Sequence, residues 1–297
     1  MKNDTFSTLH PLVNFAYFAL VIVFGMFFLH PVCLAASLVG SFAYSVFLKG
    51  EKAIKFNILY MLPMLIFAAL INPAFNHAGA TILIYLSDGN PITLESIIYG
   101  AAAACMFISI IMWFSCYNAI MTSDKFIYLF GRIIPALSLI FSMVLRFVPR
   151  YAAQIRQISN AQRCIGRDVS QGKLLKRAKN GITILSIMMT WALENAIETA
   201  DSMKSRGYGL PHRTSFSLFR FDNRDKAALL SITVLASIVL VGAAAGENVI
   251  IFFPTVRMSG ITYMSSIVYC AYFVLCLLPC IIDTLEEIKW KRIESKI

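Results

Sequence analysis

Apolar residues gather in six long blocks along this chain, and shorter polar segments separate them. A bilayer core requires about 20 consecutive apolar residues in helical form, with a range of about 17–25. Five of the blocks have 16–22 residues and the fourth has 30, so each is long enough or nearly long enough to span, and the pattern predicts six transmembrane helices. They are Leu12–Leu29, Val32–Leu48, Phe56–Ile71 (which contains Pro63 and is expected to kink there), Ile92–Met121, Ala227–Ala245 and Ile261–Ile282.

The composition also indicates a membrane protein. Of the 297 residues, 58% are apolar and only 14% are charged, whereas about a quarter of the residues of a soluble domain are charged. We therefore expect an all-α polytopic membrane protein. Lys and Arg number 26 against 16 Asp and Glu. Cytoplasmic loops of membrane proteins are enriched in Lys and Arg, so the lipid bilayer is an expected partner and nucleic acid is not.

The distribution of Lys and Arg predicts which loops face the cytoplasm. Lys49, Lys52 and Lys55 follow the second block and mark the inside. Two later loops, Asn72–Pro91 and Gly246–Gly260, carry one Lys or Arg between them and are expected outside. The chain is thus predicted to cross the plasma membrane several times, with both termini in the cytoplasm.

The segment Phe126–Val148 is apolar enough to span, but crossing would place a strongly basic stretch outside. The positive-inside bias argues against that arrangement, so this segment is predicted not to cross. The chain then contains a membrane domain at 1–124, a cytoplasmic helical domain at 125–225, and C-terminal membrane helices with a basic tail at 226–297. The cations that crossing would externalise are Arg150, Arg156, Arg163, Arg167, Lys173, Lys176, Arg177 and Lys179.

Two basic helices, each ended by a glycine, are expected in the cytoplasmic domain. Pro149 suits the first turn of the first helix, and Gly166 suits the left-handed position after its end. Ser170 is expected to cap the second helix, which would stop at Gly207. Apolar residues recur on one face of the first helix, at Tyr151, Ile155, Ile158 and Ile165.

Arg163 and Arg206 lie near these two helix ends, and two interpretations stay open. A cation near a helix C-terminus complements the macrodipole, worth about 0.3–1 kcal/mol. However, two such ends in one domain, one of them followed by Tyr208 and Gly209, favour docking onto an acidic groove of a partner.

The chain offers little catalytic chemistry. Gly166–Lys173 resembles a phosphate-binding loop, but the glycine spacing is wrong and Leu174 stands where Ser or Thr is required. The cysteines and histidines are too scattered to predict a metal site, and no cofactor is expected. Three carboxylates could perform acid–base work, although a solvated face or pairing with nearby arginines is favoured: Glu194, Glu198 and Asp201.

The predicted spans hold few charged residues, which argues against an ion-coupled pathway within the chain. If the protein takes part in active transport, the energy and much of the substrate recognition should come from other subunits. A stand-alone secondary transporter or channel stays the alternative, and a membrane-embedded enzyme ranks last.

Two regions resemble a known family. One is I-N-P-A-F-N-H-A-G-A-T-I-L-I-Y (Ile71–Tyr85) followed by G-N-P-I-T-L-E-S-I-I-Y-G (Gly89–Gly100), and the other is the pair of helix ends A-Q-R-C-I-G and K-S-R-G-Y-G. With the order of the spans, they resemble the transmembrane (T) component of energy-coupling factor (ECF) transporters, including the cobalt-type permease subunit. The resemblance covers nearly the whole chain.

The resemblance implies a larger transport complex. Two cytoplasmic ABC-type ATPases would bind arginine-tipped coupling helices through acidic grooves, and a separate membrane S component would bind a vitamin or metal ion. The T component would be non-catalytic and would transmit ATPase motion to the S component. Contacts with the S component are expected at Ile155, Ile158, Met188 and Met189.

The chain departs from the family pattern at the first helix end. Ile165 stands where an arginine is usual, so Arg163 or Arg167 would supply the charge, or this end would dock through apolar contacts; Arg163 is the favoured candidate. The ATPase-docking residues that the resemblance implies are Arg163, Gly166, Ser205, Arg206 and Gly207.

Overall fold

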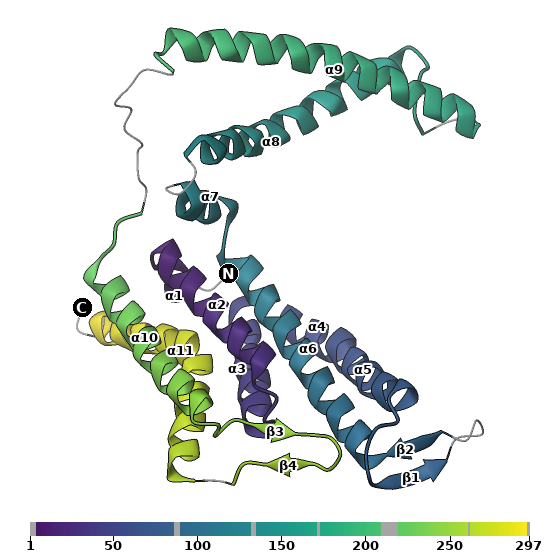
Figure 1. The fold of residues 1–297 in the computed structure, drawn as a ribbon. Coiled ribbons are helices and arrows are strands. Elements are labelled where there is room, and N and C mark those ends of the chain that lie inside the picture. The colour runs from purple at the N-terminus through teal and green to yellow at the C-terminus, as the bar shows by residue number, and fades with distance from the viewer. Residues whose placement is uncertain are drawn as a thin grey trace. The chain divides into compact units, whose positions relative to one another are not determined.

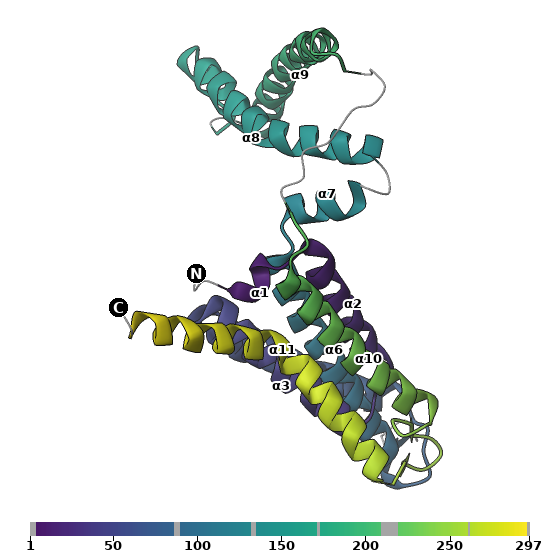
Figure 2. The same cartoon turned by 90° about the vertical axis from the view of Figure 1, so that its left-hand side faces the viewer.

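The computed structural model describes residues 4–85, 90–131, 135–170, 173–208, 219–260 and 262–295. The chain divides into two compact units. One, here called the membrane unit, combines Met1–Phe126 with Phe219–Ile297, and the other, the paired-helix unit, is Ile127–Leu218. The ribbon in Figures 1 and 2 shows that both are built from long helices. The protein is an all-α polytopic membrane protein, as predicted.

The membrane unit contains the six predicted apolar blocks, and each is mostly helical; Ile92 and Thr93 of the fourth block instead form part of a short strand, and Ile261 lies outside the described residues. Five helices are long and apolar enough to cross a bilayer, and α2 (Pro11–Phe27) is a shorter apolar helix. The five are α3 (Pro31–Lys49), the continuous run Glu51–Phe75, α6 (Leu94–Ile120), α10 (Asn223–Ala244) and α11 (Tyr263–Glu294).

The helical run Glu51–Phe75 is irregular beside Pro63. It consists of α4 (Glu51–Phe56), a π-helical turn η1 (Asn57–Met61) and α5 (Leu62–Phe75). Pro63 has no amide hydrogen to donate to the carbonyl of the preceding turn, and π-helical turns are a recognised cause of bends. The irregularity therefore lies where the sequence predicts a kink.

Aromatic rings fill the centre of the membrane unit. Phe18 and Tyr17 of α2 lie edge-on to Trp113 of α6, with ring centroids 6.3 and 6.1 Å apart. Trp113 is fully buried, and its Nε1 donates a hydrogen bond of 3.1 Å to Ser37 Oγ of α3. Edge-on aromatic pairs add to the packing energy, so three helices are joined through one indole.

Small residues allow the helices of this unit to approach closely. A Cβ added at Gly40 of α3 would lie 2.7 Å from Cys276 Cβ of α11, and one added at Gly242 of α10 would lie 2.2 Å from Val268 Cγ2 of α11. Lipid gives little hydrophobic drive for helix association, so close packing of this kind stabilises membrane bundles.

The start of the described chain is fastened to the last two helices of the unit. The short helix α1 (Thr5–Thr8) presents the Phe6 amide to Asp283 Oδ1 of α11, at 2.9 Å. The His10 amide donates to Asp225 Oδ1 of α10, also at 2.9 Å. These carboxylates satisfy one buried and one part-buried backbone donor.

Two small hairpins were not expected from the sequence. β1 (Ile82–Tyr85) pairs with β2 (Pro91–Thr93), and β3 (Ile250–Ile251) pairs with β4 (Arg257–Met258). Both lie at the end of the bundle away from α1 (Figure 1), and the Ala80 amide joins the two regions by donating to Pro254 O at 3.0 Å. The first hairpin lies in the predicted loop Asn72–Pro91 except for Ile92 and Thr93, which were predicted to begin the fourth span, and the second lies in Gly246–Gly260. That both loops face the outside stays a prediction.

The segment Phe126–Val148 is divided between α7 (Ser123–Gly131) and α8 (Pro135–Cys164); residues 132–134 lie outside the described ranges. Neither helix is among the described helices that are both long and apolar enough to span. The paired-helix unit is completed by α9 (Leu174–Ser205). Its placement in the cytoplasm stays a prediction.

Candidate functional site

The paired-helix unit is held together by a small apolar core. Ile158 of α8 and Ile184 and Met188 of α9 are the buried side chains, and Tyr151 and Trp191 pack against them. Tyr151 meets Trp191 edge-on with ring centroids 5.5 Å apart. Most other side chains of both helices are exposed, so the unit presents much of its surface to possible partners.

The prediction that Pro149 begins a helix is wrong, because Pro149 lies inside α8. A proline within a helix costs about 3 kcal/mol or more. Its neighbours make two contacts: Phe147 stacks on Tyr151 of the same helix at 5.7 Å, and the Arg150 guanidinium lies 5.6 Å from the centre of the Trp191 ring of α9. Contacts of this kind favour the continuous helix over a break at the proline.

Helix α8 ends in a glycine-containing Schellman turn. Gly166 has a φ of +75°, as the sequence predicts, and its amide donates to Arg163 O at 3.0 Å. The Arg167 amide donates to Gln162 O at 2.9 Å. This pair of hydrogen bonds defines the motif, and it fixes the backbone of residues 162–167, here called the α8 end.

Helix α9 ends in the same way. Gly207 has a φ of +78°, its amide donates to Lys204 O at 3.0 Å, and the Tyr208 amide donates to Met203 O at 3.0 Å. Residues 203–208 form the α9 end; Gly209 lies outside the described residues. Because both ends contain the same two Schellman hydrogen bonds, they can be compared position by position, with Arg206 corresponding to Ile165.

Asp168 binds several groups just beyond the α8 end. Its carboxylate lies 3.3 Å from Arg163 Nε and accepts hydrogen bonds from the amide and hydroxyl of Ser170, at 3.0 and 2.6 Å. The Ser170 hydrogen bonds, together with the charge of Arg163, lower the pKa of Asp168. Asn180 Nδ2 donates to Asp168 O at 2.9 Å, so this turn is tied to α9.

The prediction that Ser170 caps α9 is therefore wrong. Helix α9 begins at Leu174 with Lys173 at the N-cap, and the Lys173 side chain makes no capping hydrogen bond. Ser170 gives both its donors to Asp168 instead. Local side-chain bonding of this kind competes with helix capping.

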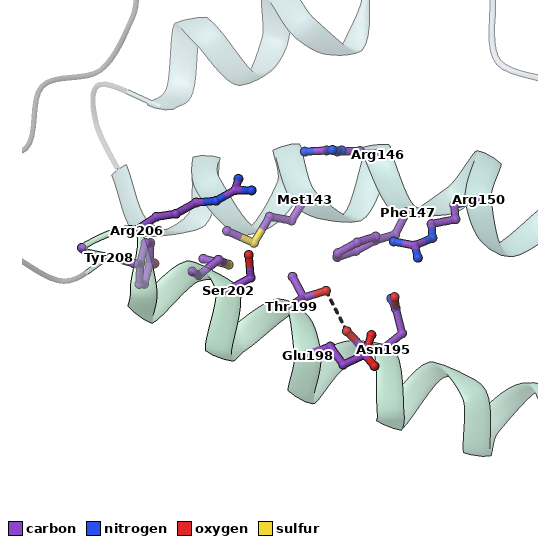
Figure 3. Close-up of a pocket in the computed structure, with 12 residues that line it drawn as sticks. Met143, Arg146, Phe147, Arg150, Asn195, Glu198, Thr199, Ser202, Arg206 and Tyr208 are labelled. Atoms are coloured by element: carbon purple, nitrogen blue, oxygen red, sulfur yellow. Dashed lines mark hydrogen bonds between the residues drawn. The ribbon is translucent and has the colours of Figure 1, made fainter.

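A groove of about 740 Å³ lies between α8 and α9 beside the α9 end (Figure 3). Arg146 and Arg150 line it from α8, and Arg206 lines it from the end of α9. Glu198 is the acidic residue among its lining residues. None of the three arginines has an ion-pair partner within the described residues, so the groove is strongly basic.

Hydrogen-bond donors add to the character of the groove. Asn195 lines it and is buried, yet its Nδ2 has no acceptor among the described residues. Ser202 lines it as well. Donors and cations together favour an anionic partner such as a carboxylate. Sequence reasoning missed Arg146 and Arg150, although their spacing of four places both on one helix face.

The remaining candidate residues differ in accessibility. Ser205 is exposed, and its hydroxyl donates to Asp201 O at 2.9 Å. Ile155 and Met189 are exposed, whereas Ile158 and Met188 are buried between the two helices. Only the first pair can meet another protein without rearrangement. Of the three carboxylates noted in the sequence, Glu194, Glu198 and Asp201, all are exposed and only Glu198 lines the groove.

Comparison with known proteins gives consistent matches. A family model described as cobalt transport protein, CbiQ, matches residues 5–216. The energy-coupling factor transporter transmembrane protein EcfT of Lactobacillus helveticus is 36% identical over 106 residues, which are 35% of this chain and 38% of that protein. EcfT of Lactococcus lactis is 33% identical over 105 residues, 35% of this chain and 40% of the relative. The aligned part thus spans about two fifths of these relatives.

A longer match exists in Listeria monocytogenes. Its energy-coupling factor transporter transmembrane protein EcfT 1 is 28% identical over 209 residues, covering 66% of this chain and 74% of the relative. The family match extends through both α8 and α9. The similarity therefore includes the two helix ends described above.

Proposed function

The chain belongs to the cobalt transport protein family CbiQ, and we propose that it is the transmembrane T component of an energy-coupling factor importer. In this role it links two cytoplasmic ABC-type ATPases to a membrane S component that binds a vitamin or metal ion. The chain itself is non-catalytic. The names of its relatives, which are transporter transmembrane proteins, support this assignment.

One observation carries the proposal: α8 and α9 end in the same exposed backbone motif within one unit. A helix end offers unpaired carbonyls and a defined side-chain direction, so two matching ends suit two related partners. Arg206 stands at the C-cap of α9, exposed and beside Arg146 and Arg150. This basic surface fits an acidic groove on an ATPase.

The sidedness follows from the same proposal. The ATPases are cytoplasmic, so the paired-helix unit lies inside the cell. With the four spans proposed before this unit and the two proposed after it, both termini lie inside as well. The basic residues of α8 and α9 then obey the positive-inside bias. The unit corresponds to the cytoplasmic domain proposed at 125–225.

The outward face of α9 is proposed to contact the S component. Met189 lies in a stripe of exposed apolar residues that recur every three or four positions, which is one helix face opposite the buried Ile184 and Met188. Ile155 of α8 is exposed as well. Methionine adapts to partners of different shape, as a component serving several S components requires. The stripe comprises Ile182, Leu185, Met189, Leu193 and Ile197.

Reversal of the charge at Arg206 tests the docking role. We expect Arg206→Glu to weaken co-purification of the ATPases at least about tenfold, because breaking an interfacial charge pair costs about 2–5 kcal/mol and 1.4 kcal/mol is tenfold. Arg156→Glu is the matched control, since Arg156 is an exposed arginine of α8 that does not line the groove. Equal retention of the ATPases by both variants would refute docking through Arg206.

A further inference from the structure

The two helix ends carry the same kinds of side chain in opposite order. At the α9 end, Arg206 occupies the C-cap and Tyr208 follows the glycine. At the α8 end, Ile165 occupies the C-cap and Arg167 follows the glycine. At the two positions that flank the left-handed glycine, each end thus offers one cation and one large apolar or aromatic group.

Arg163 is poorly placed to supply the charge of the α8 end. It lies two positions before the C-cap, where the α9 end has Lys204, so it does not correspond to Arg206. Its Nε is also 3.3 Å from Asp168, which balances its charge. The pair is largely exposed on the arginine side, so breaking or sharing it costs only a small amount of free energy, and Arg163 gains that much less from a second carboxylate than an unpaired guanidinium does.

Arg167 has the opposite properties. Its side chain is exposed and forms no ion pair within the described part of the chain. Its amide is held on Gln162 O at 2.9 Å, so the point from which its side chain extends is fixed. Ile165 beside it is 63% exposed, which leaves a large apolar group uncovered at the helix terminus.

Resting on the proposed function, the structure assigns the charged contact of the α8 end to Arg167, with Ile165 as an apolar contact at the C-cap. Consecutive Cα atoms are about 3.8 Å apart, so the cation is displaced by up to about 7 Å relative to its place at the α9 end. The partner of the α8 end therefore needs an apolar pocket at the helix terminus and a carboxylate beyond it. The two ends fit two different ATPase subunits.

Neutral substitutions of the two arginines test this assignment. The full chain is co-expressed with the two ABC-type ATPase subunits of its ECF transporter, each carrying a different affinity tag. We expect Arg167→Gln to lower retention of one ATPase about tenfold, and Arg163→Gln to change it less than twofold. Both are exposed arginines four positions apart, so they are matched in chemistry. A larger loss from Arg163→Gln, or none from Arg167→Gln, would overturn the assignment.

Arg206→Gln in the same assay separates this inference from the proposed function. If Arg206→Gln lowers ATPase retention and Arg167→Gln does not, only the assignment of Arg167 fails. If neither variant lowers ATPase retention, the proposal that the ATPases dock on the helix ends is wrong.

An exchange of side chains gives a second test that keeps the composition and the glycine. The double variant Ile165→Arg/Arg167→Ile moves the cation to the C-cap, as at the α9 end. Each variant is first checked for a monodisperse elution profile. We expect the exchange to lower retention of the ATPase that Arg167→Gln affects and to leave the other ATPase unchanged. Unchanged retention of both ATPases would contradict a role for the order of the two side chains.

Discussion

The membrane unit and the paired-helix unit differ most in how they bury apolar side chains. The membrane unit holds fully buried aromatic residues, including Trp113, Tyr17 and Tyr44, from several helices. In the paired-helix unit, the buried apolar side chains of the described residues are Ile158, Ile184 and Met188. One unit is therefore fixed by its own packing, whereas the other has a thin core and a large exposed surface.

This difference predicts that the two units differ in local stability. Local stability follows the density of buried contacts, so the paired-helix unit should open at lower free energy than the membrane unit. Its helix ends are nevertheless well defined, because backbone hydrogen bonds and two glycines determine them. The paired-helix unit therefore combines a small core with two helix ends of fixed backbone geometry.

Removal of the central indole should produce the largest loss of stability. Trp→Ala changes in buried cores cost about 3–5 kcal/mol, and the cost in a membrane protein should lie near the lower value because lipid is itself apolar. We expect Trp113→Ala to lower the thermal midpoint of the purified chain more than any substitution in the paired-helix unit. Differential scanning fluorimetry in detergent measures this.

The control for that prediction is Trp113→Phe. It keeps a ring among Tyr17 and Phe18 and loses the hydrogen bond to Ser37, so it should cost only about 1–2 kcal/mol. If Trp113→Ala were no worse than Ile184→Ala, the contrast between the two units would be wrong.

The helices of the membrane unit could be predicted from the sequence, but the contacts between them and the hairpins could not. The thickness and apolar nature of the bilayer core set the length and composition of a spanning helix, so the six apolar helices could be predicted from the sequence alone. The carboxylates of Asp225 and Asp283 could not, because their partners Phe6 and His10 are more than 200 positions away along the chain. The hairpins were missed because strands of two to four residues leave no reliable alternation pattern.

In the paired-helix unit, sequence reasoning succeeded where a local rule decides the structure. Gly166 and Gly207 were predicted correctly, because a positive φ strongly favours glycine. Pro149 and Ser170 were predicted wrongly, because an aromatic cluster and a carboxylate override local preferences there. The basic groove was missed since it requires α8 and α9 to be paired in space.

Truncation of the small core should loosen the paired-helix unit alone. Ile→Ala changes cost about 2–5 kcal/mol when buried, and we expect about 2 kcal/mol for Ile184→Ala because it is still 8% exposed in a core of three residues. Hydrogen–deuterium exchange should rise in α8 and α9 and stay unchanged in α6. Ile182→Ala is the matched control, since Ile182 is 67% exposed. Similar exchange in both variants would show that this core does not hold the helices together.

Alanine at Gly166 should give the smallest and most local effect. No atom lies within 4 Å of a Cβ added at Gly166, so the cost comes from the left-handed backbone alone. That conformation costs an L-residue about 1–2 kcal/mol, and Asn tolerates it better than Ala. We expect faster amide exchange at Arg167 in Gly166→Ala than in Gly166→Asn, with the thermal midpoint of the membrane unit unchanged.

The same pair of variants sharpens the comparison between the units. Neither changes a core residue or a charge, so any loss of ATPase retention must come from the direction of the chain after the helix. Gly166→Ala should then weaken retention of the ATPase that Arg167→Gln affects, and Gly166→Asn should weaken it less. If Gly166→Ala loosened the Arg167 amide but left both ATPases fully retained, the fixed backbone of the α8 end would have no part in docking.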